Sequence, residues 1–228
     1  MMAKFFKYTL VLVLFFIIEK QDCTAQKIEL KMLMGEQVLY LDSNYKLGSA
    51  DSIQITALKF YISDVEFWNN DSLLNTEKKS YHLIDITNPE SFFLQFDLPF
   101  INAYNQIKFK LGIDSAAHAA GAMSGALDPL NGMYWTWQSG YINSKIEGFY
   151  IEQGVKKVFQ FHLGGYQNPF NALQELTLKV QSKAILPIAF DLMPFFQLID
   201  LKNRHHIMQP SSEAVLFSRN LKKCFTLK

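Results

Sequence analysis

The sequence contains little cysteine, glycine and proline, and its positive and negative charges nearly cancel. Two cysteines among 228 residues exclude a disulfide-stabilised scaffold. Eleven glycines and seven prolines exclude collagen-like and low-complexity chains. A formal net charge of +1 provides no field to attract nucleic acid or an anionic membrane, so we expect neither as a partner.

Apolar and aromatic residues, in contrast, are plentiful. Hydrophobic residues make up 49% of the chain and aromatic residues 14%, with 20 Phe and 10 Tyr. This apolar content can offset the entropy lost on ordering the chain, which excludes disorder, and the aromatic residues favour strands. An all-β fold of about 200 residues is often a single domain. We find no repeat or linker, and we predict one domain over residues 26–228.

Residues 1–25 have the pattern of a cleaved signal peptide. Lys4 and Lys7 precede an uninterrupted apolar run over residues 8–18, which is too short to span a bilayer comfortably. Small residues at 23–25 predict cleavage after Ala25. We therefore expect a periplasmic or secreted protein, and no later run is long enough for a transmembrane segment.

Two alternatives for the N-terminus remain open. The apolar run could be an uncleaved anchor. Cys23 could carry a lipid, but the residues just before it, Lys20, Gln21 and Asp22, do not fit the lipidation pattern of an apolar residue followed by small ones.

Stretches that alternate apolar and polar residues recur along the mature chain and predict about nine short strands. These stretches lie at residues 27–34, 53–68 with a bend at 63–64, 80–86, 91–98, 106–113, 135–151, 155–163, 173–180 and 186–191. The polar residues 69–79 read as a hairpin loop. We therefore predict an all-β fold, a single antiparallel β-sandwich.

Two stretches depart from the strand pattern. The alanine-rich residues 115–126 predict a short helix or an ordered loop packed on the sheet. Residues 211–225 predict a C-terminal helix, because Pro210 precedes them, Ser211 or Ser212 can cap the first turn, and Glu213 complements the helix dipole.

The motifs of common enzymes are missing, and we do not expect an enzyme. The sequence has no GxSxG, P-loop, GxGxxG or HExxH motif and no zinc-spaced cysteine pair. Asp114 and Asp128 flank the alanine-rich stretch and are interpreted as turn and cap residues. Cys224 is interpreted as a core residue of the last helix.

Histidines and one tryptophan-rich segment are the candidate functional residues. Imidazole is the commonest side-chain ligand of late transition metals, but a single histidine is more often structural. The histidines are His82, His118, His162, His205 and His206. In residues 127–141 (LDPLNGMYWTWQSGY), the two-residue period of a strand would place Trp135 and Trp137 on one face.

The aromatic segment has two interpretations that need no metal. It could be a core cluster beneath a sandwich. It could instead bind glycans or surface polymers by stacking on Trp135, Trp137 and Tyr141, which requires these rings to be exposed.

Several blocks together resemble the MbnP-like family of methanobactin-associated copper-binding proteins. The most specific is GALDPLNGMYWTWQSGYINSKIEG, preceded by FKLGID and followed by FQFHLGG. The blocks LKFYISDVEFW, YHLID and HHIMQPSS fit the family as well. The resemblance covers nearly all of the mature chain, from about Ile28 to the last helix.

The resemblance implies an exported β-sandwich that binds copper. In such proteins a partner di-haem protein, related to the cytochrome c peroxidases, oxidises a tryptophan to kynurenine, which joins histidines around the metal. The residues to which this carries over are Trp135, Trp137, His162, His82, His205 and His206. His162 and His82 are the preferred ligands. A relative of the family has a histidine two residues after the modified tryptophan, where this chain has Trp137.

Overall fold

The computed structural model describes residues 25–47, 51–99, 103–137 and 140–227. Residues 1–24, including Cys23, lie outside this range, so cleavage and lipidation at the N-terminus stay predictions. Within the described ranges, no helix combines the length and the apolar character needed to cross a membrane.

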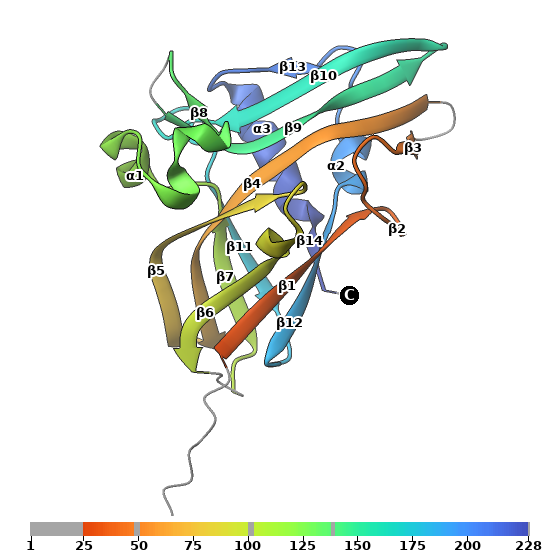
Figure 1. Ribbon diagram of the computed structural model, residues 1–228. Helices are drawn as coiled ribbons and strands as arrows, with labels where there is room; N and C mark the ends of the chain where they lie inside the picture. Colours follow the sequence, from red (N-terminus) through yellow and green to blue (C-terminus); the bar gives the residue numbers. More distant parts are fainter. Residues whose placement is uncertain (1–24, 48–50, 100–102, 138–139, 228) are drawn as a thin grey trace, which may run out of the picture.

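Strands dominate these residues and form two sheets, which confirms the all-β prediction (Figure 1). The nine strands of the larger sheet, counted over the described residues, are β3 (Asn44–Leu47), β4 (Asp51–Asn69), β5 (Ser72–Asp85), β7 (Gln106–Leu111), β8 (Tyr134–Trp135), β9 (Gly140–Glu152), β10 (Val155–Gly164), β11 (Gln174–Lys179) and β13 (His206–Ile207). The five of the smaller sheet, counted likewise, are β1 (Ala25–Met34), β2 (Gln37–Val38), β6 (Phe93–Pro99), β12 (Ile185–Asp191) and β14 (Phe225–Thr226).

The order of the strands places distant segments side by side. The larger sheet runs β11-β7-β4-β9-β10-β13, and β3 and β5 also pair with β4 while β8 pairs with β9. The smaller sheet runs β14-β12-β1-β2, and β6 also pairs with β1. Two pairings, β1 with β12 and β10 with β13, are parallel. The sheets are therefore not purely antiparallel as predicted, because segments far apart in the sequence can pair without the tight turn that favours antiparallel neighbours.

The main core lies between the two sheets and is rich in phenylalanine. Alternation along β10 turns Phe159, Phe161 and Leu163 into this core, while the residues between them face the other way. Helices α2 (Met193–Gln197) and α3 (Ser212–Leu221) add further aromatic rings, such as Phe217, whose ring centroid lies 5.1 Å from that of Phe161. The C-terminal helix predicted over residues 211–225 is found at Ser212–Leu221 and is followed by η4 (Lys222–Cys224).

The predicted loop between β4 and β5 is wrong, whereas an irregularity is found at Ser63 and Asp64 as expected. Residues 69–79 do not form a loop: a tight turn at Asn70 and Asp71 leads directly into β5. Asn70 has a φ of 50°, a left-handed conformation that asparagine adopts more readily than most residues. The expected bend at Ser63 and Asp64 is a β-bulge inside one long strand, and it interrupts the pairing of β4 with β5 without ending either strand.

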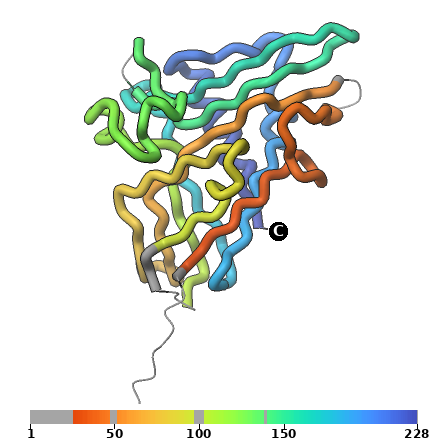
Figure 2. The backbone as a smooth tube through the Cα atoms, in the orientation of Figure 1, coloured from red at the N-terminus to blue at the C-terminus, as the bar shows by residue number. Residues whose placement is uncertain are grey.

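A lobe formed by residues 113–135 covers part of the larger sheet on the side away from the smaller sheet, called here the outer face (Figure 2). It contains α1 (Ser115–Ala120), η2 (Gly125–Leu127), η3 (Pro129–Asn131) and β8, while η1 (Pro89–Phe92) lies elsewhere, between β5 and β6. Asp114 caps α1 and Asp128 caps η3, as predicted. A second core beneath the lobe consists of Tyr61, Ile113, Ala117, Leu127, Met133, Trp135, Tyr141 and Ile142.

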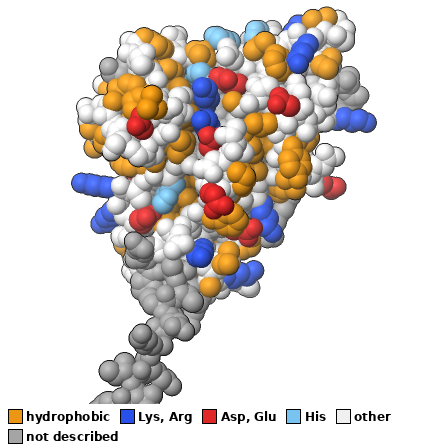
Figure 3. All heavy atoms as spheres, in the orientation of Figure 1, with side chains coloured by type: hydrophobic (Ala, Val, Ile, Leu, Met, Phe, Trp, Pro, Cys, Tyr) orange, Lys and Arg blue, Asp and Glu red, His pale blue; other side chains and the backbone are white. Residues whose placement is uncertain are grey.

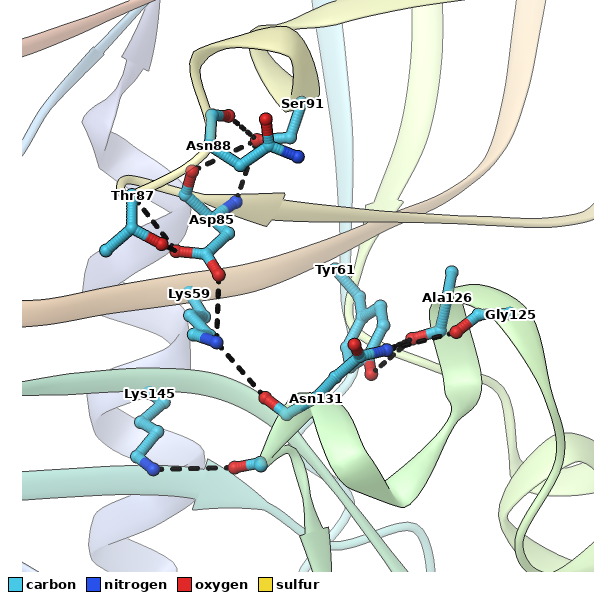
Figure 4. Close-up of polar contacts among 11 residues, drawn as sticks. Lys59, Tyr61, Asp85, Thr87, Asn88, Ser91, Gly125, Ala126, Asn131 and Lys145 are labelled. Atoms are coloured by element: carbon cyan, nitrogen blue, oxygen red, sulfur yellow. Dashed lines mark hydrogen bonds and ion pairs between the residues drawn. The ribbon is translucent and has the colours of Figure 1, made fainter.

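Polar contacts attach the lobe to the sheet (Figure 4). Lys59 on β4 donates a hydrogen bond to the carbonyl of Asn131 at 3.2 Å and pairs with Asp85 at 2.8 Å. Tyr61, also on β4, donates from its hydroxyl to the carbonyl of Ala126 at 2.9 Å. The lobe is therefore attached to β4, and this attachment positions its last residues, which include Trp135.

Candidate metal site

The two candidate tryptophans have different surroundings. Trp135 is 5% exposed, whereas Trp137 is 63% exposed. The prediction that both share one strand face is wrong, because β8 ends at Trp135 and Trp137 lies in the following turn. Their ring centroids are nevertheless only 6.1 Å apart, with the ring planes inclined by 50°. The segment thus presents a buried indole next to an exposed one.

Trp135 occupies a position that depends on a glycine of β10. A β-carbon on Gly164 would lie 2.7 Å from Cη2 and Cζ3 of the Trp135 ring, so the indole packs directly on the backbone. The Nε1 atom of Trp135 is buried and has no hydrogen-bond partner among the described residues. Trp135 is therefore held on the outer face, at the end of β10.

His162 lies two residues before Gly164 and, by the alternation of a strand, on the same side of β10. Its Nε2 atom is 2.6 Å from Oε1 of Glu147 on β9. Its Nδ1 atom is buried and, within the described part of the chain, unpartnered. Burial lowers the pKa of His162, which favours its neutral form, the form that can bind a metal ion.

His206 reaches the same face from β13. In the parallel pairing of β13 with β10, His206 lies opposite Gln160, which precedes His162 by two residues. This register places His206 and His162 near each other on the same side of the sheet. Figure 3 shows histidine side chains gathered at the upper edge of the molecule, over the position of β10 and β13 in Figure 1.

A hollow adjoins His206. It has a volume of about 510 Å³ and is lined by Trp137, His206, Ile207, Met208, Gln209, Ser211 and Glu213. The exposed indole and the imidazole of His206 therefore border the same space, which is open to molecules from outside.

His82 and His205 do not join this group. His82 on β5 lies opposite Ile62, a residue of the main core. Its ring packs edge-to-face with that of Phe96 from the smaller sheet, with the ring centroids 5.7 Å apart. It therefore faces the inside of the fold, on the opposite side of the sheet from His162. The Nε2 atom of His82 is 2.8 Å from Oε2 of Glu77. The structure thus separates the two histidines that the resemblance favoured, because β5 and β10 present them on opposite faces.

His205 is exposed and precedes β13. Its carbonyl oxygen accepts a hydrogen bond from the backbone N–H of Gln160 at 2.8 Å. Its backbone therefore extends the contact between β13 and β10, and this places the next residue, His206, beside that strand.

The fifth histidine, His118, is structural. Its Nδ1 accepts from the N–H of Tyr141 at 3.0 Å, so Nε2 carries the proton and donates to Asn143 Oδ1 at 3.3 Å. The ring stacks on Tyr166 with centroids 4.7 Å apart. Burial lowers the pKa of His118 to about 4. Both ring nitrogens are engaged within the fold, and His118 is not a candidate ligand.

Burial also bears on the other interpretations of the sequence. Tyr141 is 0% exposed and Trp135 nearly buried, so a stacking platform of three rings is not present, and Trp137 alone is exposed. Cys224 is buried as expected, and burial raises the pKa of its thiol to about 12, which makes it a poor nucleophile.

The outer face offers few donor atoms to a metal ion. Among the described residues, no group of three or more His, Cys, Asp and Glu side chains is arranged to hold a metal ion. The outer face instead carries the buried, unpartnered nitrogen of His162, the exposed imidazole of His206 and the two indoles. Glu147 was not among the candidates from sequence, because only the pairing of β9 with β10 places it beside His162.

Comparison with known proteins identifies a family and a structural neighbour of this chain. No curated protein sequence matches the chain. The structure resembles that of MbnP from Methylosinus trichosporium, with a TM-score of 0.53 and 14% sequence identity over 85% of this chain and 86% of that chain, a likeness that shows the fold. The MbnP family model matches residues 24–211, which include all the candidate tryptophans and histidines. The chain therefore belongs to the MbnP family.

Proposed function

We propose that this protein is an exported copper-binding protein whose metal site lies on the outer face, with His162 and His206 as ligands. The observation that carries the proposal is the Nδ1 atom of His162, which is buried without a hydrogen-bond partner among the described residues. An unsatisfied buried polar atom costs about 1–3 kcal/mol. A bound metal ion removes that cost, since the unpartnered lone pair becomes a ligand.

The donor types favour copper over other metals. Copper has the highest affinity in the divalent series, and imidazole nitrogen suits it well. Two imidazoles are a small donor set, which matches the low coordination number that Cu(I) accepts. Membership of the MbnP family supports the same metal, because the resemblance of the sequence to that family implies copper binding.

A third donor comes from the tryptophan pair once an indole has been oxidised. The indole nitrogen is only a hydrogen-bond donor, whereas kynurenine has an aryl amine and a ketone that can bind a metal. Two molecules of peroxide supply the two oxygen atoms that open the ring, and hydrolysis then releases formate. We propose a di-haem protein related to the cytochrome c peroxidases as the catalyst of this step.

Between the two indoles, exposure favours Trp137 as the target of a protein oxidant. Its ring is 63% exposed and borders the same hollow as His206. Trp135 is buried behind it, with ring centroids 6.1 Å apart. Peptide mass mapping after treatment with the di-haem protein and peroxide tests this choice. Kynurenine at Trp137 is expected, and an unmodified pair of tryptophans would contradict the oxidative step.

Metal counting tests the copper site itself. The mature protein, before and after oxidation, is loaded with Cu(I), freed of unbound metal by gel filtration and analysed for copper by mass spectrometry. We expect stoichiometric copper in the oxidised protein and its loss in H162A and H206A. His82→Ala is the matched control, since His82 also pairs with a glutamate but faces the inside of the fold, and it should retain copper. Copper at background level in both forms of the unmutated protein would overturn the proposal.

A further inference from the structure

We infer that Glu147 is a positioning residue of the metal site: it holds the ring of His162 so that Nδ1, and not Nε2, is the metal-binding atom. The inference rests on the proposed function and adds two points to it, the ligand atom and the side chain that selects it. Neither follows from the sequence, because Glu147 precedes His162 by fifteen residues and meets it only through strand pairing.

The hydrogen bond between these two side chains determines where the proton lies. Nε2 of His162 is 2.6 Å from Oε1 of Glu147. An ionised carboxylate can only accept hydrogen bonds, so Nε2 must carry the hydrogen and donate it. In a neutral imidazole the lone pair is then on Nδ1, which is the atom that is buried and unpartnered among the described residues.

The other protonation states of His162 fit the geometry less well. With the hydrogen on Nδ1, the lone pair of Nε2 would face a carboxylate oxygen at 2.6 Å, and a buried N–H would lack an acceptor. A doubly protonated ring would leave the same buried N–H unsatisfied. Only the Nε2–H form pairs its hydrogen and leaves a free lone pair.

A lysine lies beside the carboxylate of Glu147. Lys145, two residues earlier on β9, has its Nζ atom 3.8 Å from Oε1 of Glu147 and donates a hydrogen bond to the carbonyl of Gly132 in the lobe at 3.4 Å. Figure 4 shows Lys145 reaching from the sheet to the lobe. A carboxylate that orients a metal-binding histidine typically contributes a factor of about 10–100 to metal affinity.

The tautomer is measured first, without any metal. Long-range proton–nitrogen NMR spectra of the apo protein, labelled with ¹⁵N-histidine, distinguish the two neutral forms. We expect His162 to show the Nε2–H form in the unmutated protein and in Glu147→Gln, whose amide oxygen can still accept. In Glu147→Ala we expect a mixture of forms. An Nδ1–H form in the unmutated protein would overturn the inference, whatever the variants do.

Copper affinity is measured next, by competition with a chelator of known affinity. We expect Glu147→Ala to weaken Cu(I) binding by roughly 10–100-fold, with much of the loss recovered in Glu147→Gln. Glu77→Ala is the control, because Glu77 forms the same kind of pair with His82 at 2.8 Å on the other side of the sheet, and it should leave the affinity unchanged.

The two failures can be told apart. If the unmutated, oxidised protein binds no copper, the proposed function is wrong. If it binds copper but Glu147→Ala and Glu147→Gln bind as tightly as the unmutated protein, the copper site stands and the role of Glu147 is wrong. Should Glu147→Ala not fold, the tautomer in the unmutated protein and the affinity of Glu147→Gln still decide the matter.

Discussion

The six-membered ring of Trp135 lies directly on the backbone of Gly164. A β-carbon at Gly164 would come within 2.7 Å of two carbon atoms of that ring and within 2.7 Å of the carbonyl oxygen of Tyr141. The carbonyl oxygen belongs to the backbone and cannot easily move. The glycine therefore sets how closely Trp135 approaches β10, and His162 lies only two residues away on the same side of that strand.

Replacing this glycine should destabilise the protein. In Gly164→Ala, we expect the free energy of unfolding in urea to fall by about 1–3 kcal/mol, because the added methyl group overpacks the contact. Gly140→Ala is the control: its β-carbon would meet its nearest neighbour, Nδ1 of His118, at an ordinary 3.5 Å, and the loss should be smaller. Equal stability of Gly164→Ala and the unmutated protein would contradict this account of the contact.

The two tryptophans should differ sharply in their contribution to stability. Trp135→Ala removes a buried ring and should cost about 3–5 kcal/mol of unfolding free energy. Trp137→Ala removes an exposed ring and should change it by no more than about 0.5 kcal/mol. Chemical unfolding of both variants, followed by circular dichroism, makes the comparison, and similar losses in the two would refute the difference in packing.

The sequence predicted the class of the fold but not the arrangement of this site. Strand alternation and the capping serine of α3 are local patterns, and both are found in the structure: Ser211 accepts from the N–H of Ala214 at 3.1 Å. The approach of His206 to His162 depends on β13, a two-residue strand paired in parallel with a distant segment. No local pattern marks such a strand, and so the sequence could not select His206 over His82.

The tryptophan pair shows the same limit at shorter range. The two-residue period would place Trp135 and Trp137 together only if one strand continued through both. The chain instead turns at Thr136 and Trp137. Neither residue is a glycine or a proline, the residues that most often indicate a turn in a sequence. The separation into a buried and an exposed ring therefore appears only in the folded chain.

Acidification should destabilise the protein through His118. Burial lowers the pKa of this histidine from 6.5 to about 4 in the folded state. Between these values His118 binds more protons in the unfolded chain than in the folded one. The unfolding free energy is therefore highest, as far as His118 determines it, above pH 6.5, and it declines as the pH falls towards 4. A shift of this size corresponds to roughly 3 kcal/mol.

The variant His118→Gln isolates that contribution, since glutamine does not titrate. His162, whose pKa is also lowered by burial, still contributes in the same direction in both proteins. We therefore expect the dependence of urea unfolding on pH between 4 and 6.5 to be shallower in the variant. Identical slopes would show that the burial of His118 does not govern its protonation.

Loss of Lys59 should loosen the lobe. In Lys59→Met, the pair with Asp85 and the hydrogen bond to the carbonyl of Asn131 are both lost. We expect hydrogen exchange at residues 125–132 to accelerate, with a local opening free energy lower by about 1 kcal/mol. Lys110→Met is the matched control, because Lys110 pairs with Asp64 at the same 2.8 Å and is similarly exposed. Equal exchange of the lobe in both variants would contradict its attachment through Lys59.

The position of β1 in the smaller sheet has a consequence for how the chain acquires its fold. β1 is the first described strand, yet it lies inside the sheet, and Lys27 is in register with Ile185 of β12 (Figure 1). As the chain emerges, the first described strand must therefore wait for β12, one of the last, before the sheet can close. Such distant pairing slows folding and keeps apolar strand edges uncovered until β12 is available. A nascent chain that ends before Ile185 cannot yet form the parallel pairing of β1.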